Sequence, residues 1–236
     1  PENKYIMIIR LIKLLTVILF ILGSGMTNAQ NPADYYDRLF KDSVLISSEI
    51  ENVLERLAEE PGTKICGDRI HNIEYLSNLY EQAGHKAFWM NYLHFSEAIQ
   101  CLMSSSEDGL LPLDYHLEAL NGITSRLGEA GNDPLNAGEI DVLVTDAVLL
   151  YAFNLLYGKT DPKTLVPTWN FGYSPIPDLD HESFRQWITG LKLPSMLESF
   201  RPDLPIYDSL MAALERYRGY GQNGGWVPIL AGGKIS

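Results

Sequence analysis

Cysteine and positive charge are scarce in this 236-residue chain. It has two cysteines, and its 18 Lys and Arg residues face 30 Asp and Glu residues, which gives a net charge of −12. The shortage of cations argues against a nucleic-acid-binding protein, because phosphate contacts need clustered Lys and Arg. With 46% hydrophobic residues, 13 Pro and 19 Gly, the chain is neither disordered nor collagenous. The composition therefore indicates an acidic globular domain of ordinary size.

Catalytic and cofactor-binding motifs are also missing. The sequence has no His-Glu-x-x-His, no Gly-x-Ser-x-Gly, no phosphate loop and no Cys-x-x-Cys. Residues 219–224 match Gly-x-Gly-x-x-Gly, but a predicted helix precedes them and Gly-Trp-Val-Pro follows, so we expect a flexible turn rather than a phosphate cradle. We therefore predict no catalytic residue, no cofactor and no metal ligand in this chain.

The first 29 residues have the pattern of a signal peptide. Arg10 and Lys13 precede an apolar run at 14–22, and small residues lead to Ala29, the expected cleavage site, with Met7 as the expected start. A retained N-terminal anchor is the alternative. Cleavage would remove a net charge of +2 and deepen the charge of the mature part from −12 to −14. We therefore predict export to the periplasm or cell envelope.

The pattern of apolar residues predicts a mainly α-helical fold. Residues 139–157 are the most apolar stretch, so we expect them to form the central helix of an irregular bundle. The C-terminal tail from Gly224 to Leu230 is strand-like. Other predicted helical stretches are 34–59, a helix that Asp68 caps and Gly84 ends, 92–105, 113–127 opened by Pro112, 182–189, 195–199, and 206–217 with Tyr207, Leu210, Leu214 and Tyr217 on one face.

Few polar residues combine into a candidate site. Export would allow a disulfide between Cys66 and Cys101, and the sequence leaves their pairing open; neither is expected to be a nucleophile. Two His-Glu pairs, 71 with 74 and 94 with 97, each share a helical face but lack a third ligand.

Two further segments allow more than one interpretation. The cluster at 178–182 contains potential metal ligands, but an acidic loop with Asp180 capping the next helix explains it equally well. Trp169, Phe171 and Tyr173 either line a sugar-binding groove or pack back on the helices.

Three segments resemble a known family. The first is Gly-Leu-Leu-Pro-Leu-Asp-Tyr-His at 109–116. The second combines Asp-Val-Leu-Val-Thr-Asp-Ala at 141–147, Tyr-Ala at 151–152 and Tyr-Gly-Lys-Thr-Asp-Pro at 157–162. The third runs from Arg-Pro at 201–202 through Tyr207, Leu210 and Tyr217 to Gly-Gly-Trp at 224–226. In order and spacing they resemble the N-terminal scaffold region of L,D-transpeptidases of the YcbB type, over about residues 68–233.

The resemblance implies a larger exported enzyme that acts on peptidoglycan. In that family the helical scaffold precedes a small peptidoglycan-binding module and a β-rich catalytic domain with a Ser-His-Gly-Cys motif. The Cys thiolate attacks a stem peptide and forms 3→3 cross-links. This motif is absent from the sequence, so no catalytic residue carries over, and we expect a fragment that lacks both domains.

We therefore expect three segments: a signal peptide at 1–29, a helical lead-in at 30–67 and a scaffold domain at 68–233. The expected partners are the catalytic domain of the same polypeptide and, through the missing domains, peptidoglycan. One alternative is a free-standing periplasmic binding module that kept the scaffold without the enzyme. Another is an independent hydrolase that uses the 178–182 cluster.

Overall fold

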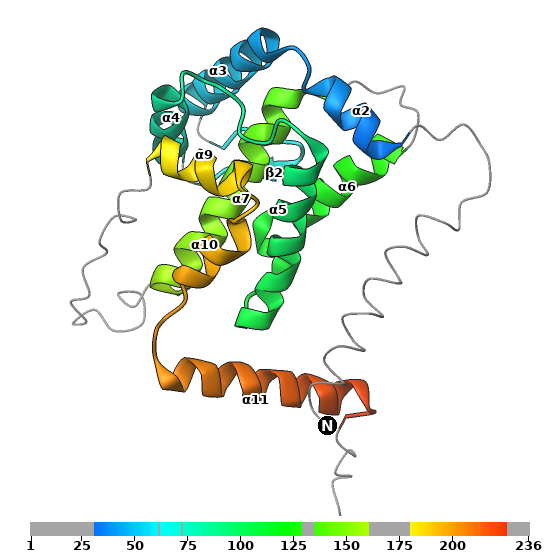
Figure 1. Cartoon of the computed structure of the whole chain (residues 1–236), viewed down its shortest axis with the longest axis vertical. Helices are drawn as coiled ribbons and strands as arrows, with labels where there is room; N and C mark the ends of the chain where they lie inside the picture. Colours follow the sequence, from blue (N-terminus) through cyan, green and yellow to red (C-terminus); the bar gives the residue numbers. More distant parts are fainter. Residues whose placement is uncertain (1–30, 61, 72, 129–134, 161–179, 226–236) are drawn as a thin grey trace, which may run out of the picture.

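A computed structural model describes residues 31–60, 62–71, 73–128, 135–160 and 180–225 (Figure 1). This part of the chain is mainly helical, as predicted. Residues 1–29 with Ala29, the aromatic residues at 169–173, and the tail beyond 225 lie outside the described residues. The elements are α2 Pro32–Leu39, α3 Ser43–Glu59, β1 Lys64–Ile65, β2 Asp68–Arg69, α4 Ile73–Gln82, α5 Tyr92–Ser104, η1 Ser105–Asp108, η2 Pro112–Tyr115, α6 Leu117–Gly128, α7 Ala137–Tyr157, α9 His181–Thr189, α10 Leu193–Ser199 and α11 Pro205–Gln222, where η marks a 3₁₀ helix.

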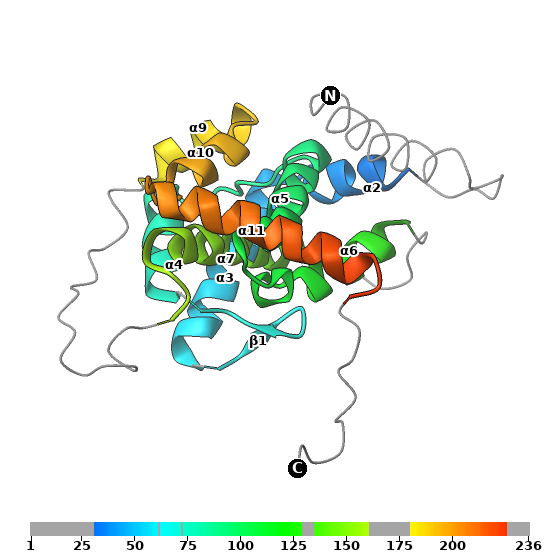
Figure 2. The same cartoon turned by 90° about the horizontal axis from the view of Figure 1, so that it is seen from below.

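Helix α7 is the centre of the bundle, which confirms the prediction for 139–157. The side chain of Asn136 caps its N-terminus by accepting a hydrogen bond from the Glu139 amide. Fifteen of its 21 residues are buried, because α3, α4 and α5 pack on different sides of it. Figures 1 and 2 show this central position from two directions. Helix α7 is long and apolar enough to cross a membrane, but most of it lies inside the bundle.

The N-terminal third departs from the prediction in two places. The predicted helix at 34–59 is two helices, because Asp42 accepts hydrogen bonds from the amides of Val44 and Leu45 and caps α3. Asp68 was predicted to cap a helix, but it lies instead in the antiparallel β1–β2 hairpin. The hairpin turn consists of Cys66 and Gly67, which both have a positive φ, as a two-residue type I′ turn requires.

The predicted helix at 113–127 begins later than expected. Pro112 opens the short 3₁₀ helix η2, and His116 follows it with φ 57° and ψ 17°, in the left-handed region. A residue in this conformation cannot continue a right-handed helix, so α6 begins only at Leu117. Helix α9 agrees closely with the prediction, and Asp180 caps it by accepting a hydrogen bond from the Ser183 amide at 2.7 Å.

Helix α11 is longer and more exposed than predicted. It continues through residues 219–222, where the glycines predicted a turn, and it has no buried residue. It runs across one end of the bundle (Figures 1 and 2). Its Leu214 lies beside Gly109, just after η1. The residues predicted to share one face of this helix therefore do not all pack on the bundle: Leu214 does, whereas Leu210 and Tyr217 are exposed to solvent.

The core of the bundle contains a buried carboxylate. Asp141 of α7 accepts hydrogen bonds from the Tyr80 hydroxyl at 2.6 Å and from the amides of Phe88 and Trp89 at 3.1 and 2.9 Å. One turn later, Thr145 accepts a hydrogen bond from the Trp89 indole at 2.9 Å. These contacts attach the connection between α4 and α5 to α7, in place of backbone pairing.

Burial raises the pKa of Asp141 to about 6, although its hydrogen bonds act in the opposite direction. The carboxyl group thus favours folding while it is protonated, and this contribution is lost as the pH rises from the unfolded value near 3.8 through 6. We expect carbon-13 NMR of the Asp141 carboxyl group to show a titration midpoint near pH 6. A midpoint below 4 would contradict the effect of burial.

Close packing between α7 and α3 makes a second prediction. A Cβ atom on Gly138 would lie 2.6 Å from Glu49 Cβ and 2.8 Å from the Ile50 amide nitrogen. Gly138→Ala should therefore lower the free energy of unfolding by about 1–3 kcal/mol. The control is Gly122→Ala in α6, where a Cβ would meet nothing within 4 Å. It should raise stability by about 0.5–1 kcal/mol, because alanine loses less backbone entropy on folding. Urea unfolding measures both, and equal effects would refute the packing argument.

Candidate functional site

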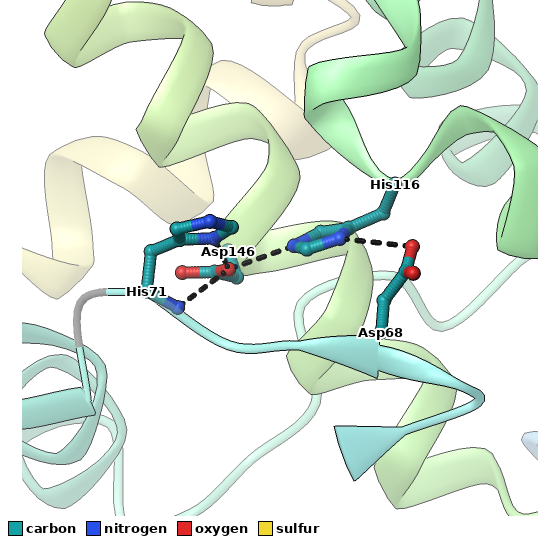
Figure 3. A network of polar contacts seen from close by, with 4 residues as sticks. All are labelled: Asp68, His71, His116 and Asp146. Atoms are coloured by element: carbon teal, nitrogen blue, oxygen red, sulfur yellow. Dashed lines mark hydrogen bonds and ion pairs between the residues drawn. The ribbon is translucent and has the colours of Figure 1, made fainter. Parts of the chain in front are cut away.

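Asp146 of α7 is the centre of a network of histidines and carboxylates (Figure 3). Its side chain is 0% exposed. The Oδ2 atom lies 2.8 Å from His116 Nε2 and 3.2 Å from His71 Nδ1, and it accepts a hydrogen bond from the His71 amide at 3.1 Å. A single oxygen atom thus joins two imidazole rings and one backbone segment.

His116 continues the network to a second carboxylate. Its Nδ1 atom lies 3.2 Å from Asp68 Oδ2 in strand β2, so both ring nitrogens face carboxylate oxygens. The ring is 4% exposed, and the left-handed backbone at residue 116 turns it back into the bundle. Such a conformation is uncommon for a residue other than glycine and is tolerated where surrounding contacts fix it.

The network reaches solvent at His71, which follows Asp68 by three residues. The His71 side chain is 43% exposed, and it lines an open depression of about 430 Å³ together with Ile73, Glu74, Tyr75 and Asn78. The site therefore has a buried carboxylate at one end and a solvent-accessible imidazole at the other.

The electrostatics of the site favour an ionised Asp146. Burial alone raises its pKa, but the hydrogen bonds from His116 and His71 outweigh burial and lower the pKa to about 2. The hydrogen bond to Asp146 in turn raises the pKa of His71, against the effect of its partial burial. The group can share protons between carboxylate and imidazole, or offer nitrogen and oxygen ligands to a metal ion. It contains no hydroxyl or thiol that could act as a nucleophile.

The sequence did not predict this grouping. Asp68 was expected as a helix cap and His71 as part of a pair with Glu74 on a helical face, but His71 precedes α4 and faces Asp146. The four residues are spread over 78 positions, from Asp68 to Asp146, so no local spacing reveals them. The available signal was indirect: His116 and Asp146 lie in two of the segments that resemble the scaffold region.

The two cysteines are free thiols that lie apart from the network. Cys66 is in the hairpin turn, with its sulfur 3.9 Å from Glu139 Oε2, and Cys101 is buried in α5. Burial raises the pKa of Cys66 to about 11 and that of Cys101 to about 12. Both side chains are therefore neutral near pH 7, which makes them weak nucleophiles.

The backbone at His116 gives a prediction that separates strain from side-chain contacts. His116→Gly and His116→Ala both remove the ring and leave Asp146 without its shortest contact, so both should be destabilised. Only alanine retains the steric cost of the left-handed conformation, so the glycine variant should be more stable than the alanine variant by about 1 kcal/mol. Thermal unfolding of the pair measures this difference. An alanine variant as stable as the glycine variant would mean that residue 116 does not hold a positive φ.

The comparison with family models adds one finding. A model described as the scaffold domain matches residues 74–214, which is more than half of the chain, and this range includes His116 and Asp146. No curated protein and no solved structure matches the chain significantly. The length of the match is sufficient to assign the family: the chain belongs to the scaffold-domain family.

Proposed function

We propose that the chain is the non-catalytic scaffold portion of an exported L,D-transpeptidase of the YcbB type, which forms 3→3 cross-links in peptidoglycan. The family match supports this proposal, because it covers most of the segments that resemble such enzymes. The observation that carries the proposal is the arrangement of these segments. Their characteristic residues bind one another instead of forming a reactive centre.

The first and second segments are joined by a row of side-chain contacts. His116 contacts Asp146, the hydroxyl of Tyr115 accepts a hydrogen bond from Asn154 at 3.0 Å, and Lys159 forms an ion pair with Asp114. Consecutive residues 116, 115 and 114 thus contact positions that follow one another from the middle of α7 to just beyond its end. Such contacts hold η2 against α7, which is a structural role.

The third segment is attached to η1, directly before the first segment. Arg201 donates hydrogen bonds to both carboxylate oxygens of Asp108, at 2.7 and 3.0 Å. Tyr207 of α11 and Tyr151 of α7 also donate to Asp108, at 2.7 and 2.6 Å. The Asp108 carboxyl group is completely buried, so these contacts firmly connect α11 to the bundle.

Helix α11 then presents an apolar face outward. Ile206, Leu210, Tyr217 and Tyr220 are all more than half exposed. Their spacing of four, seven and three residues puts them on one side of the helix. A row of exposed apolar side chains on a firmly attached helix is suited to contact with another domain. We assign this face to the catalytic domain of the same polypeptide.

The location and the substrate belong to the same proposal. The signal-peptide pattern of residues 1–29 supports export to the periplasm or cell envelope. The net charge of −12 makes direct electrostatic binding of an anionic wall polymer by this domain unfavourable. Contact with peptidoglycan would therefore be made by the peptidoglycan-binding and catalytic domains.

The downstream reading frame provides the first test. A Ser-His-Gly-Cys motif within a few hundred codons would support the transpeptidase. An open reading frame that ends without it would leave a free-standing interaction module as the better account.

The second test uses the full-length enzyme and muropeptide substrates. Leu210→Glu introduces a charge into the apolar face of α11 and should lower the rate of 3→3 cross-link formation about tenfold, the loss expected when about 1.4 kcal/mol of docking energy is removed. The control is Ala212→Glu, an exposed position about 160° away around the helix. It should keep the wild-type rate. Equal rates for both variants, with both folded, would refute the docking role of this face.

A further inference from the structure

We propose that His71, His116 and Asp146 bind a divalent transition-metal ion, with Zn²⁺ as the best match. This inference is independent of the proposed function, because it needs neither the catalytic domain nor peptidoglycan. Among the described residues, these three are a group whose nitrogen and oxygen atoms all lie within 4.8 Å of one another. Two imidazoles and one carboxylate form a ligand set that zinc commonly takes.

The distances between the ligand atoms suit an ion placed among them. Donor atoms at about 2.0–2.2 Å from a tetrahedral zinc ion are roughly 3.3 Å apart. His71 Nδ1 lies 3.2 Å from Asp146 Oδ2, close to this separation. His116 Nε2 lies 2.8 Å from the same oxygen, so that pair would need to open by roughly 0.5 Å. The two rings lie side by side, with centroids 5.4 Å apart, and one nitrogen of each faces the same Asp146 oxygen.

Asp68 supplies the outer contact that a zinc-bound histidine usually makes. The nitrogen of His116 that does not face the ligand group lies 3.2 Å from Asp68 Oδ2. A carboxylate in this position accepts the second N–H of a ligating imidazole, which fixes its tautomer and orientation (Figure 3). Asp146 has comparable support, because its oxygen also accepts the His71 amide hydrogen.

The proposed site is also open to an ion from solvent, and carboxylates give it negative charge. His71 is half-exposed at the depression that Glu74 lines, so an ion can enter from solvent on that side. A water molecule from the depression would complete a tetrahedral set of four ligands. With two neutral imidazoles, the Asp146 carboxylate and the nearby Asp68 carboxylate offset the charge of a divalent cation. The backbone conformation of His116 is also explained, because it brings the ring to Asp146 and Asp68 together.

The test measures Zn²⁺ binding to the full-length chain after treatment with a chelator. Titration against a chromophoric zinc indicator should show one ion per chain. His71→Gln and His116→Gln should each weaken binding at least tenfold, and Asp68→Asn should weaken it 10–100-fold. The matched control is His94→Gln, since His94 lies in α5 outside the group. It should bind zinc as the wild type does.

A second readout tests the ligand identity. Zinc should shift the imidazole NMR signals of His71 and His116 and leave those of His94 unchanged. It should also raise the thermal midpoint of the wild type but not that of His71→Gln, a half-exposed position where substitution is well tolerated. The absence of 1:1 binding, or equal binding by wild type and His71→Gln, would overturn the proposal and leave a hydrogen-bonded network.

Discussion

The fold depends on satisfying two carboxylates that α7 buries in an otherwise apolar bundle. An ionised carboxylate without partners is very costly in such surroundings. Asp141 therefore requires the Phe88 and Trp89 amides and the Tyr80 hydroxyl, and Asp146 requires imidazoles. These partners come from α4 and the α4–α5 connection, from the chain after the hairpin and from the end of η2. Hydrogen bonding to α7 thus determines the course of segments that have little secondary structure of their own.

The sequence predicted the parts of the fold that depend on local patterns. Helix α7 follows from its continuous apolar run, and α9 follows from the Asp180 cap. The polar network depends instead on pairs such as His71 with Asp146, which no local spacing encodes. The error at Asp68 has the same origin. An aspartate before an apolar stretch looks like a helix cap, but its oxygen lies against His116, 48 residues away.

The segments that resemble the scaffold region of transpeptidases all make contacts that hold the bundle together. Residues 114–116 contact α7 from its middle to just beyond its end, while Asp108, directly before the same segment, connects α11. Most hydrogen bonds of the characteristic polar residues are therefore made within the bundle. This arrangement fits the scaffold-domain family to which the chain belongs, since the described residues of the network form hydrogen bonds with one another and include no activated nucleophile. Contacts of this kind hold the bundle and α11 rigidly together, so the apolar face of α11 is presented in a fixed orientation.

The short stretch from Asp108 to His116 links the attachment of α11 to the proposed metal site. At one end, Asp108 fixes α11 through Arg201 and Tyr207. At the other end, His116 is part of the proposed metal site. An ion bound only by the folded chain stabilises it by a free energy that grows with the logarithm of the ion concentration. Since η2 connects both ends through a few residues, an ion on His116 would also restrict the segment that carries Asp108. Zinc would then act on the scaffold by making the attachment of α11 more rigid.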